Sequence, residues 1–334
     1  MDSLTHIVLG AAIGEVTLGN KLGNKALAYG AIISSIPDFD VFLSPLFNPV
    51  ASLFFHRGIT HSLLFVFILA PIIGLALWKI ERSKLIDLKT WILFSLFPLL
   101  SHIFIDCFNT YGTGILEPFT NIRIAYDSMA IIDFIFLMPI TIAVIWSIFY
   151  RNHNKKRRVI VWIGLSLSTI YFCFTIFNKA YVGSIARKQL AKQNIQYNRI
   201  LTTPVPLTNF LWLVVTENET GFNVGYYGNF KKVDNIEFHF VSKNSELLTT
   251  ISPSNEIDEL IRFTKGYYKV EKNPDGSLFL YDLRYASLDI ESKEAYVFTF
   301  KIHETINGIE ISRSHPNRSI NTRNLMKYFG QIFN

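Results

Sequence analysis

Long apolar runs give way to alternating polar and apolar positions about halfway along this chain. Four runs approach the ~20 apolar residues that a bilayer core of about 30 Å requires. They are Ser62–Ile80, Trp91–Cys107, Ala130–Tyr150 and Val159–Phe177. From about Asn178 the alternation is typical of a water-exposed domain. The pattern predicts a membrane domain over residues 1–178, an amphipathic helix and linker over 179–205, and a soluble β-rich domain over 206–334.

Two earlier segments, Leu4–Leu18 and Lys25–Ile36, are shorter and rich in Gly and Ala. Either they are short or tilted spans, or they form a hairpin among the longer helices, because small residues let helices approach closely. Pro37 predicts a helix end and Pro98 a kink. The expected fold is an α-helical membrane bundle of about five or six spans or half-spans.

The second half predicts a smaller α+β domain with a mostly antiparallel sheet. The amphipathic segment IARKQLAKQNIQ and the linker TTPVPLTNF precede runs rich in aromatic and β-branched residues, which are typical of strands. These runs are FLWLVVTE, FNVGYY, IEFHFV, YYKVE, LFLYDLRY and YVFTFKI. NPDG is a turn signal, and Ile257–Phe263 is expected to be a short helix. This domain is interpreted as a lid or scaffold over a site, with substrate recognition as the alternative.

Composition supports a membrane protein. Half of the 334 residues are hydrophobic and 29 are Phe, more than an ordinary soluble chain of this length carries. Cys107 and Cys173 lie in apolar runs, which argues against a disulfide framework or a thiolate zinc site. The start MDSLTH lacks the basic region of a cleavable signal peptide, so we expect it to be mature sequence.

The net charge of +6 is concentrated in two loops, and nothing resembles a nucleic-acid-binding module. One loop carries Lys79, Arg82, Lys84 and Lys89, and the other carries Arg151, Lys155, Lys156, Arg157 and Arg158. Both should be cytoplasmic by the positive-inside rule. The 109–129 loop has Arg123 as its single basic residue and should face outward. The C-terminal domain is then expected outside the cytoplasm.

With this orientation, the His and Asp residues of the first half fall at the outward face. They are His6, Asp38, Asp40, His56, His61, His102 and Asp106. Ionisable residues in membrane helices cost ~2.5–3.5 kcal/mol at the helix centre and indicate function. His102 and Asp106 are four apart, on one helix face. If IPDFD is extended after Pro37, Asp38 and Asp40 point to the same side.

His56 and His61 are five apart, about 140° around an ideal helix, so they diverge if that stretch is helical. Gly58 offers a bend. Thr60 is a plausible N-cap, which would leave His56 on a loop and His61 in the first helical turn. The sequence leaves open whether both bind a metal or one only orients its neighbour, and His56 is the favoured ligand of the two.

Imidazole and carboxylate ligands without thiolates suit zinc, and also manganese or iron. Each residue alone fits an interfacial or hydrogen-bonded role, but their convergence favours a metal. More than four candidate ligands indicate two or more ions, the arrangement of metal phosphoesterases. One of Asp38 or Asp40 would be a ligand or general base. Arg57 would offer a planar donor fork to a phosphate.

Four segments in order resemble the membrane-bound metal-dependent hydrolase family, whose bacterial members include an SOS-regulated protein: MDSLTHIVLGAAIG, IPDFD, HRGITHS, and SHIFIDCFNTYGTGILEPF followed by IIDF. That family is similar to the zinc-dependent phospholipase C and single-strand nuclease superfamily, which has a trinuclear site. The resemblance implies metal ligands at His6, at Asp38 or Asp40, at His56 or His61, and at His102 and Asp106. Two later ligand positions have no clear counterpart, Asp127 and Asp133 being the nearest acids. One or two divalent ions, most plausibly zinc, are therefore expected.

These features predict an integral cell-membrane hydrolase that cleaves a phosphoester, of lipid or lipid-linked origin, with a metal-activated water at the extracytoplasmic face. One alternative is a non-enzymatic metal-binding or transporter-like protein. A third hypothesis is a membrane-anchored binding protein that uses its soluble domain. The sequence names neither a substrate nor an oligomeric state.

Overall fold

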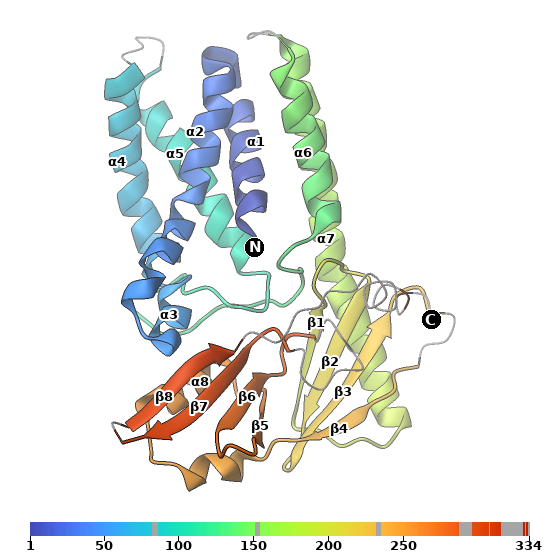
Figure 1. Cartoon of the computed structure of the whole chain (residues 1–334). Coiled ribbons are helices and arrows are strands. Elements are labelled where there is room, and N and C mark those ends of the chain that lie inside the picture. Colours follow the sequence, from blue (N-terminus) through green and yellow to red (C-terminus); the bar gives the residue numbers. More distant parts are fainter. Residues whose placement is uncertain are drawn as a thin grey trace. The chain divides into compact units, whose positions relative to one another are not determined.

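The computed structural model describes residues 1–81, 86–150, 154–231, 235–286, 296–306, 308–314, 330 and 332 (Figure 1). The chain divides into two compact units. One comprises Met1–Leu46 with Phe55–Thr175, and the other comprises Phe47–Phe54 with Ile176–Asn334. Of the basic-loop residues, Arg82, Lys84 and Arg151 lie outside the described part of the chain.

The first unit is helical. Its elements are α1 (Ser3–Leu22), α2 (Asn24–Ser35), the 3-10 helices η1 (Pro37–Leu46) and η2 (Ile59–His61), α4 (Leu63–Glu81), α5 (Leu88–Asp106), α6 (Phe134–Ile148) and the first part of α7 (Lys155–Lys192). Within the described residues, α4, α5 and α7 are long and apolar enough to cross a membrane. The pair α2–η1, bent by 42°, would be a fourth span if it crosses as one.

This number is lower than the five or six spans or half-spans expected from the sequence. α6 has only 15 residues, fewer than a straight span needs. α1 has 20 residues, but it is not among the helices apolar enough to cross a membrane. Pro37 ends α2 as predicted, whereas α5 continues through Pro98.

Helices α1 and α2 form a tightly packed hairpin. A Cβ atom added at Gly14 would lie 2.1 Å from the carbonyl oxygen of Ala26, and one added at Gly30 would lie 2.2 Å from that of Gly10. The two backbones are therefore in direct contact, as small residues permit. This packing brings the start of α1, with His6, beside the end of α2, where the chain turns into η1 and Asp38.

We predict that Gly14→Ala lowers the stability of the membrane unit by about 1–3 kcal/mol, the usual cost of overpacking. The added methyl group meets backbone, which cannot rotate away. Thermal unfolding of the purified protein in detergent measures the effect. Gly183→Ala on α7 is the control, because its Cβ would meet only the Arg187 Nη1 atom at 3.4 Å and alanine favours a helix. Equal unfolding temperatures for the two variants would contradict the close packing.

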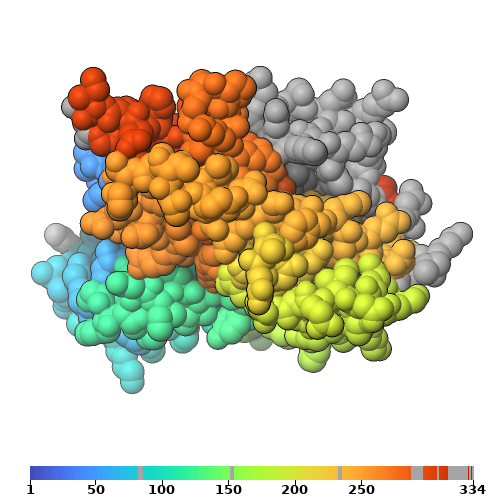
Figure 2. All heavy atoms as spheres, turned by 90° about the horizontal axis from the view of Figure 1, so that it is seen from below, coloured from blue at the N-terminus to red at the C-terminus, as the bar shows by residue number. Residues whose placement is uncertain are grey.

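The second unit contains two four-stranded antiparallel sheets. The first has the order β1 (Arg199–Pro204), β2 (Leu211–Glu217), β3 (Gly221–Gly228), β4 (His239–Ser242); the second has β5 (Tyr268–Lys272), β6 (Leu278–Asp282), β7 (Thr299–Thr305), β8 (Gly308–Ser314). The helices are α3 (Pro49–Phe55), η3 (Ser245–Thr250), α8 (Asn255–Phe263) and the end of α7. Yellow and orange atoms of the two sheets adjoin in Figure 2.

Side chains of β2 alternate between two cores, as the pleat of a strand requires. Leu213 and Val215 pack with Phe222 and Tyr267, while Trp212 and Val214 pack with residues of α7 such as Ala186. The antiparallel sheet and the 257–263 helix are confirmed. The expected linker instead contains β1, the expected amphipathic helix is a continuation of α7, and β8 was not anticipated.

Candidate metal centre

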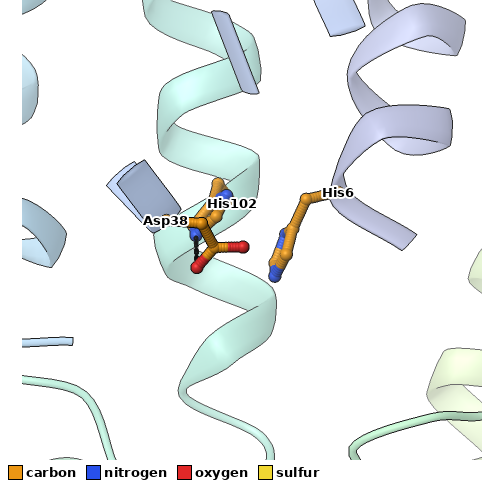
Figure 3. A group of neighbouring side chains, drawn as sticks. All are labelled: His6, Asp38 and His102. Atoms are coloured by element: carbon orange, nitrogen blue, oxygen red, sulfur yellow. Dashed lines mark ion pairs between the residues drawn. The ribbon is translucent and has the colours of Figure 1, made fainter. Parts of the chain in front are cut away.

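The structure gathers five of the seven predicted ligands where α1 begins and α5 ends. His6 lies on α1, Asp38 at the start of η1, His61 in η2, and His102 and Asp106 on the last turns of α5. All five side chains are shielded from solvent, with Asp38 retaining 10% of its exposure and the others none. In Figure 3, Asp38 faces His102 and the ring of His6 points from the neighbouring helix toward the same space.

Two histidine nitrogens form the middle of this cluster. The Nε2 atoms of His61 and His102 are 3.1 Å apart. The Oδ1 atom of Asp38 lies 3.5 Å from the first and 3.6 Å from the second. The Oδ2 atom of Asp106 lies at the same two distances, 3.5 Å and 3.6 Å. The spacing of four between His102 and Asp106 therefore places their side chains together, as predicted.

Hydrogen bonds on the far side of each ring assign its tautomer. The Nδ1 atom of His102 is 2.6 Å from the carbonyl oxygen of Ser34, which can only accept, so Nδ1 carries the proton. The Thr60 hydroxyl donates to Asp40, so it accepts from the Nδ1 atom of His61 at 3.0 Å. Burial lowers the pKa of His61 to about 4 against the raising effect of Asp38. In these tautomers both Nε2 atoms present lone pairs.

This donor set fits a divalent metal ion. Two imidazole lone pairs face two carboxylate oxygens, and the Oδ2 atom of Asp106 has no hydrogen-bond partner among the described residues. Buried lone pairs that face one another are unfavourable unless a cation lies between them. In a tetrahedral zinc site with bonds of about 2.0–2.2 Å, ligand atoms are about 3.3–3.6 Å apart. The observed separations of 3.1–3.6 Å match that spacing.

Two overlapping ligand groups can be drawn, one with His61, His102 and Asp106 and the other with His6, Asp38 and His102. They share His102, whose Nδ1 is already used by Ser34, so its Nε2 can serve one ion. The His6 ring stacks on His102 with centroids 3.6 Å apart. Its Nε2 lies 3.3 Å from Asp106 Oδ1, and neither ring nitrogen has a hydrogen-bond partner among the described residues. The geometry favours one ion over two.

Asp40 and His56 lie behind the cluster and support it. The Asp40 carboxylate is 2.9 Å from His56 Nδ1 and accepts from the Arg57 amide at 3.1 Å and from the Thr60 hydroxyl at 2.9 Å. These contacts occupy the Asp40 oxygens. The Thr60 hydroxyl, bound to Asp40, in turn orients the His61 ring. Such outer carboxylates orient ligating histidines in metal sites. The expectation that Asp38 and Asp40 point to the same side is wrong, because residues two apart in a 3-10 helix point about 120° away from each other around its axis.

Arg57 is buried and held by the protein. Its Nη1 atom donates to Asn109 at 2.8 Å, its Nη2 atom donates to the Met1 carbonyl at 3.0 Å, and its Nε atom lies 3.5 Å from Asp106 Oδ2. The guanidinium thus fixes Asp106, and both Nη atoms already have partners. Arg57 also has a φ of +59°, so the bend attributed to Gly58 includes a left-handed residue just before it.

The helix after the bend is capped by a different residue from the one predicted. Ser62, instead of Thr60, caps α4, its hydroxyl accepting from the Phe65 amide at 3.1 Å.

Asp133 caps α6 and accepts from Tyr171 at 2.9 Å, so it belongs to neither ligand group. The role of the Ser34 carbonyl could not be predicted from the sequence, because a main-chain acceptor has no side-chain signature. Asn109 could have been noticed three residues after Asp106.

Comparisons with known proteins concern mainly the helical half. A model of the YdjM inner membrane protein family matches residues 1–182. The uncharacterized protein YfhP of Bacillus subtilis is 32% identical over 155 residues, 44% of this chain and 46% of that protein. The inner membrane protein YbcI of Escherichia coli is 34% identical over 123 residues, 36% of this chain and 69% of that protein. The chain thus matches less than half the length of YfhP. No solved structure matches it.

Proposed function

The chain belongs to the YdjM inner membrane protein family, and within this family we propose that it is a metal-dependent hydrolase that cleaves a phosphoester at the extracytoplasmic face. The observation that carries the proposal is the convergence of His61 Nε2 and His102 Nε2 with carboxylate oxygens of Asp38 and Asp106. A divalent ion such as zinc, bound there, would lower the pKa of a bound water and polarise a phosphoryl oxygen.

The protein side chains divide the remaining tasks. His61, His102 and Asp106 would hold the ion and leave one coordination position for a water, as catalytic zinc sites do, with Asp38 and His6 beside them. Asp38 is the member of this set with some solvent exposure, and its Oδ2 accepts from Ser3 at 3.2 Å. A substrate would therefore approach on the Asp38 side, where this carboxylate can accept a proton from the attacking water.

Arg57 and Asp40 act through the ligands in this proposal. Arg57 forms an ion pair with Asp106 and helps to hold it in place, instead of binding the phosphate as its sequence context indicated. Asp40 holds His61 in the tautomer that presents Nε2, through Thr60. They are positioning residues.

The surroundings of Asp38 favour a lipid or lipid-linked substrate. On η1 the large apolar side chains of Phe39, Phe42 and Leu46 are 50%, 78% and 78% exposed. Exposed apolar groups of this size are typical of surfaces that contact a membrane or an apolar partner. These η1 side chains adjoin the site at the end of α5. If they contact the membrane, the lipid head groups would lie at the same depth as the His and Asp side chains.

A transporter-like function would require polar groups along a path through the bundle. Between His6 and Glu15, helix α1 instead contributes Val8, Leu9 and Ala12 to an apolar core with Ile140 of α6. The ionisable ligands are gathered at one end. This distribution supports the hydrolase over transport.

We predict that purified protein in phospholipid nanodiscs releases product from phospholipids or from soluble phosphoesters, and that a zinc chelator abolishes this release. Re-addition of Zn²⁺ should restore the rate, because the ligands are preformed by hydrogen bonds to Ser34 and Thr60. The chelator presaturated with zinc is the control. Protein that contains no metal, with activity unchanged by chelator, would exclude a metal-dependent hydrolase.

A further inference from the structure

A long groove runs along the membrane unit away from the metal centre. Its volume is about 840 Å³, and it is lined by α1, α5 and α7, with Leu63 and Ile115 near one end. Along α5 it extends from Thr90 to Phe104, which is about 21 Å at 1.5 Å per residue. That is roughly two thirds of a bilayer core, enough for one extended acyl chain.

The two ends of the groove differ. Near the metal centre, the rings of Phe104 and Phe172 bridge α5 and α7, with centroids 6.1 Å apart. At the other end lie Thr90, Arg158 and Trp162. Between these ends the lining is almost entirely apolar. The hydroxyl of Ser101 donates to its own helix at the Pro98 carbonyl, 2.9 Å away.

Arg158 is the basic residue of this lining. It is exposed and makes no hydrogen bond or ion pair to the part of the chain that the structure describes. Its neighbour Arg157 turns inward instead and binds Glu15. Exposed Lys89 and Lys155 lie at the same helix ends, so this end of the groove is positively charged.

We propose that this groove binds an anionic phospholipid of the leaflet next to Arg158. The acyl chain lies along α5, the phosphate is bound by Arg158, and Trp162 lies at the membrane interface, where tryptophan is enriched. Basic pockets between membrane helices on the cytoplasmic side suit anionic head groups, and arginine matches the geometry of a phosphate. The site is separate from the metal centre and does not depend on its activity.

The test uses the full-length protein in nanodiscs with photoreactive lipids that carry a diazirine at the end of one acyl chain. One probe is phosphatidylglycerol, which is anionic, and the other is phosphatidylcholine. The labelled peptides are identified by mass spectrometry. If the phosphate lies at Arg158, the end of the acyl chain reaches the end of the groove near Phe104, so label is expected at Phe104 and Phe172. Label at Trp162 instead would place the head group at the metal-centre end and overturn the proposal.

Charge variants test the role of Arg158. Arg158→Gln should reduce labelling by phosphatidylglycerol about fivefold, the equivalent of ~1 kcal/mol for one basic residue at a membrane surface, and leave phosphatidylcholine labelling unchanged. Lys155→Gln removes the same charge at the same helix end but does not line the groove, so it should change labelling little. Equal losses in both variants would mean general surface attraction and contradict a defined site.

A space-filling variant completes the test. Ser101→Trp fills the groove and should abolish labelling at Phe104, whereas Ile145→Trp on α6, at a position 52% exposed, should not. Thermal unfolding of both variants identifies any that misfold, and the Arg158→Gln result stands without them. Unchanged labelling in folded Ser101→Trp protein would overturn the proposal.

Discussion

His102→Ala is expected to strip the protein of its metal and of any hydrolytic activity. The His102 Nε2 atom lies within 3.6 Å of His61 Nε2, Asp38 Oδ1 and Asp106 Oδ2, so its removal opens the middle of the donor set. We expect metal affinity to fall by more than the ~10–100-fold typical of losing a residue that merely orients a ligand. Metal analysis of purified wild-type and variant protein measures this loss, and His61→Ala should behave in the same way.

His239→Ala is the matched control, because His239 is exposed on β4 and should leave metal content unchanged. Thr60→Val provides an intermediate case. It removes the hydroxyl that orients His61 but no ligand, so metal affinity should drop ~10–100-fold while the site still fills at high zinc concentration. Full metal content in the His102→Ala variant would refute the centre. Equal losses in the His102→Ala and Thr60→Val variants would refute the assigned roles.

The spacing between residues on one helix predicted local geometry well. His102 and Asp106 are four apart on α5 and meet as a helix requires. Pro37 ended α2, and the small residues of α1 and α2 allowed the hairpin. Each of these features follows from the geometry of a single helix or from the size and shape of the residues at one position. The apolar runs likewise located α4 and α5 to within a few residues.

Relations that depend on the exact backbone conformation were not predictable. Asp38 and Asp40 were assigned to one side on the assumption of an extended chain, but η1 separates them, so Asp38 lies beside His61 and His102 while Asp40 contacts His56 and Thr60. His56 was favoured over His61 as a ligand, but His61 lies in the cluster and His56 contacts Asp40 instead. Arg57, between the two histidines, has a left-handed conformation that residue identity does not specify, since such a φ is uncommon outside glycine and asparagine.

The number of spans was overestimated because an apolar run does not reveal where a helix ends. The run Ala130–Tyr150 contains the α6 helix, but Asp133 caps it and shortens it to 15 residues. In the second half, the prolines in TTPVPLTNF indicated a linker, yet β1 ends at the first of them, Pro204. Edge strands tolerate proline in this way, and β1 is an edge strand of its sheet.

Breaking a buried ion pair at the opposite end of the bundle is expected to destabilise the membrane unit strongly. Glu15 and Arg157 are each 1% exposed. Arg157 donates from Nε and Nη2 to the two carboxylate oxygens of Glu15, each at 2.7 Å. Gly19 leaves room for this carboxylate, because a Cβ atom at position 19 would lie only 2.4 Å from the carboxylate of Glu15. The pair connects α1, which carries His6, to α7.

Either Glu15→Gln or Arg157→Gln should lower the free energy of unfolding by about 3–5 kcal/mol, because each leaves an uncompensated buried charge. The double variant should lose less than the sum of the two, since it buries no charge, and the difference gives the coupling energy. Denaturation in mixed detergent, followed by tryptophan fluorescence, provides the measurement, with exposed Lys156→Gln as the control. Additive losses would mean that the two side chains act independently and that the pair does not hold α1 against α7.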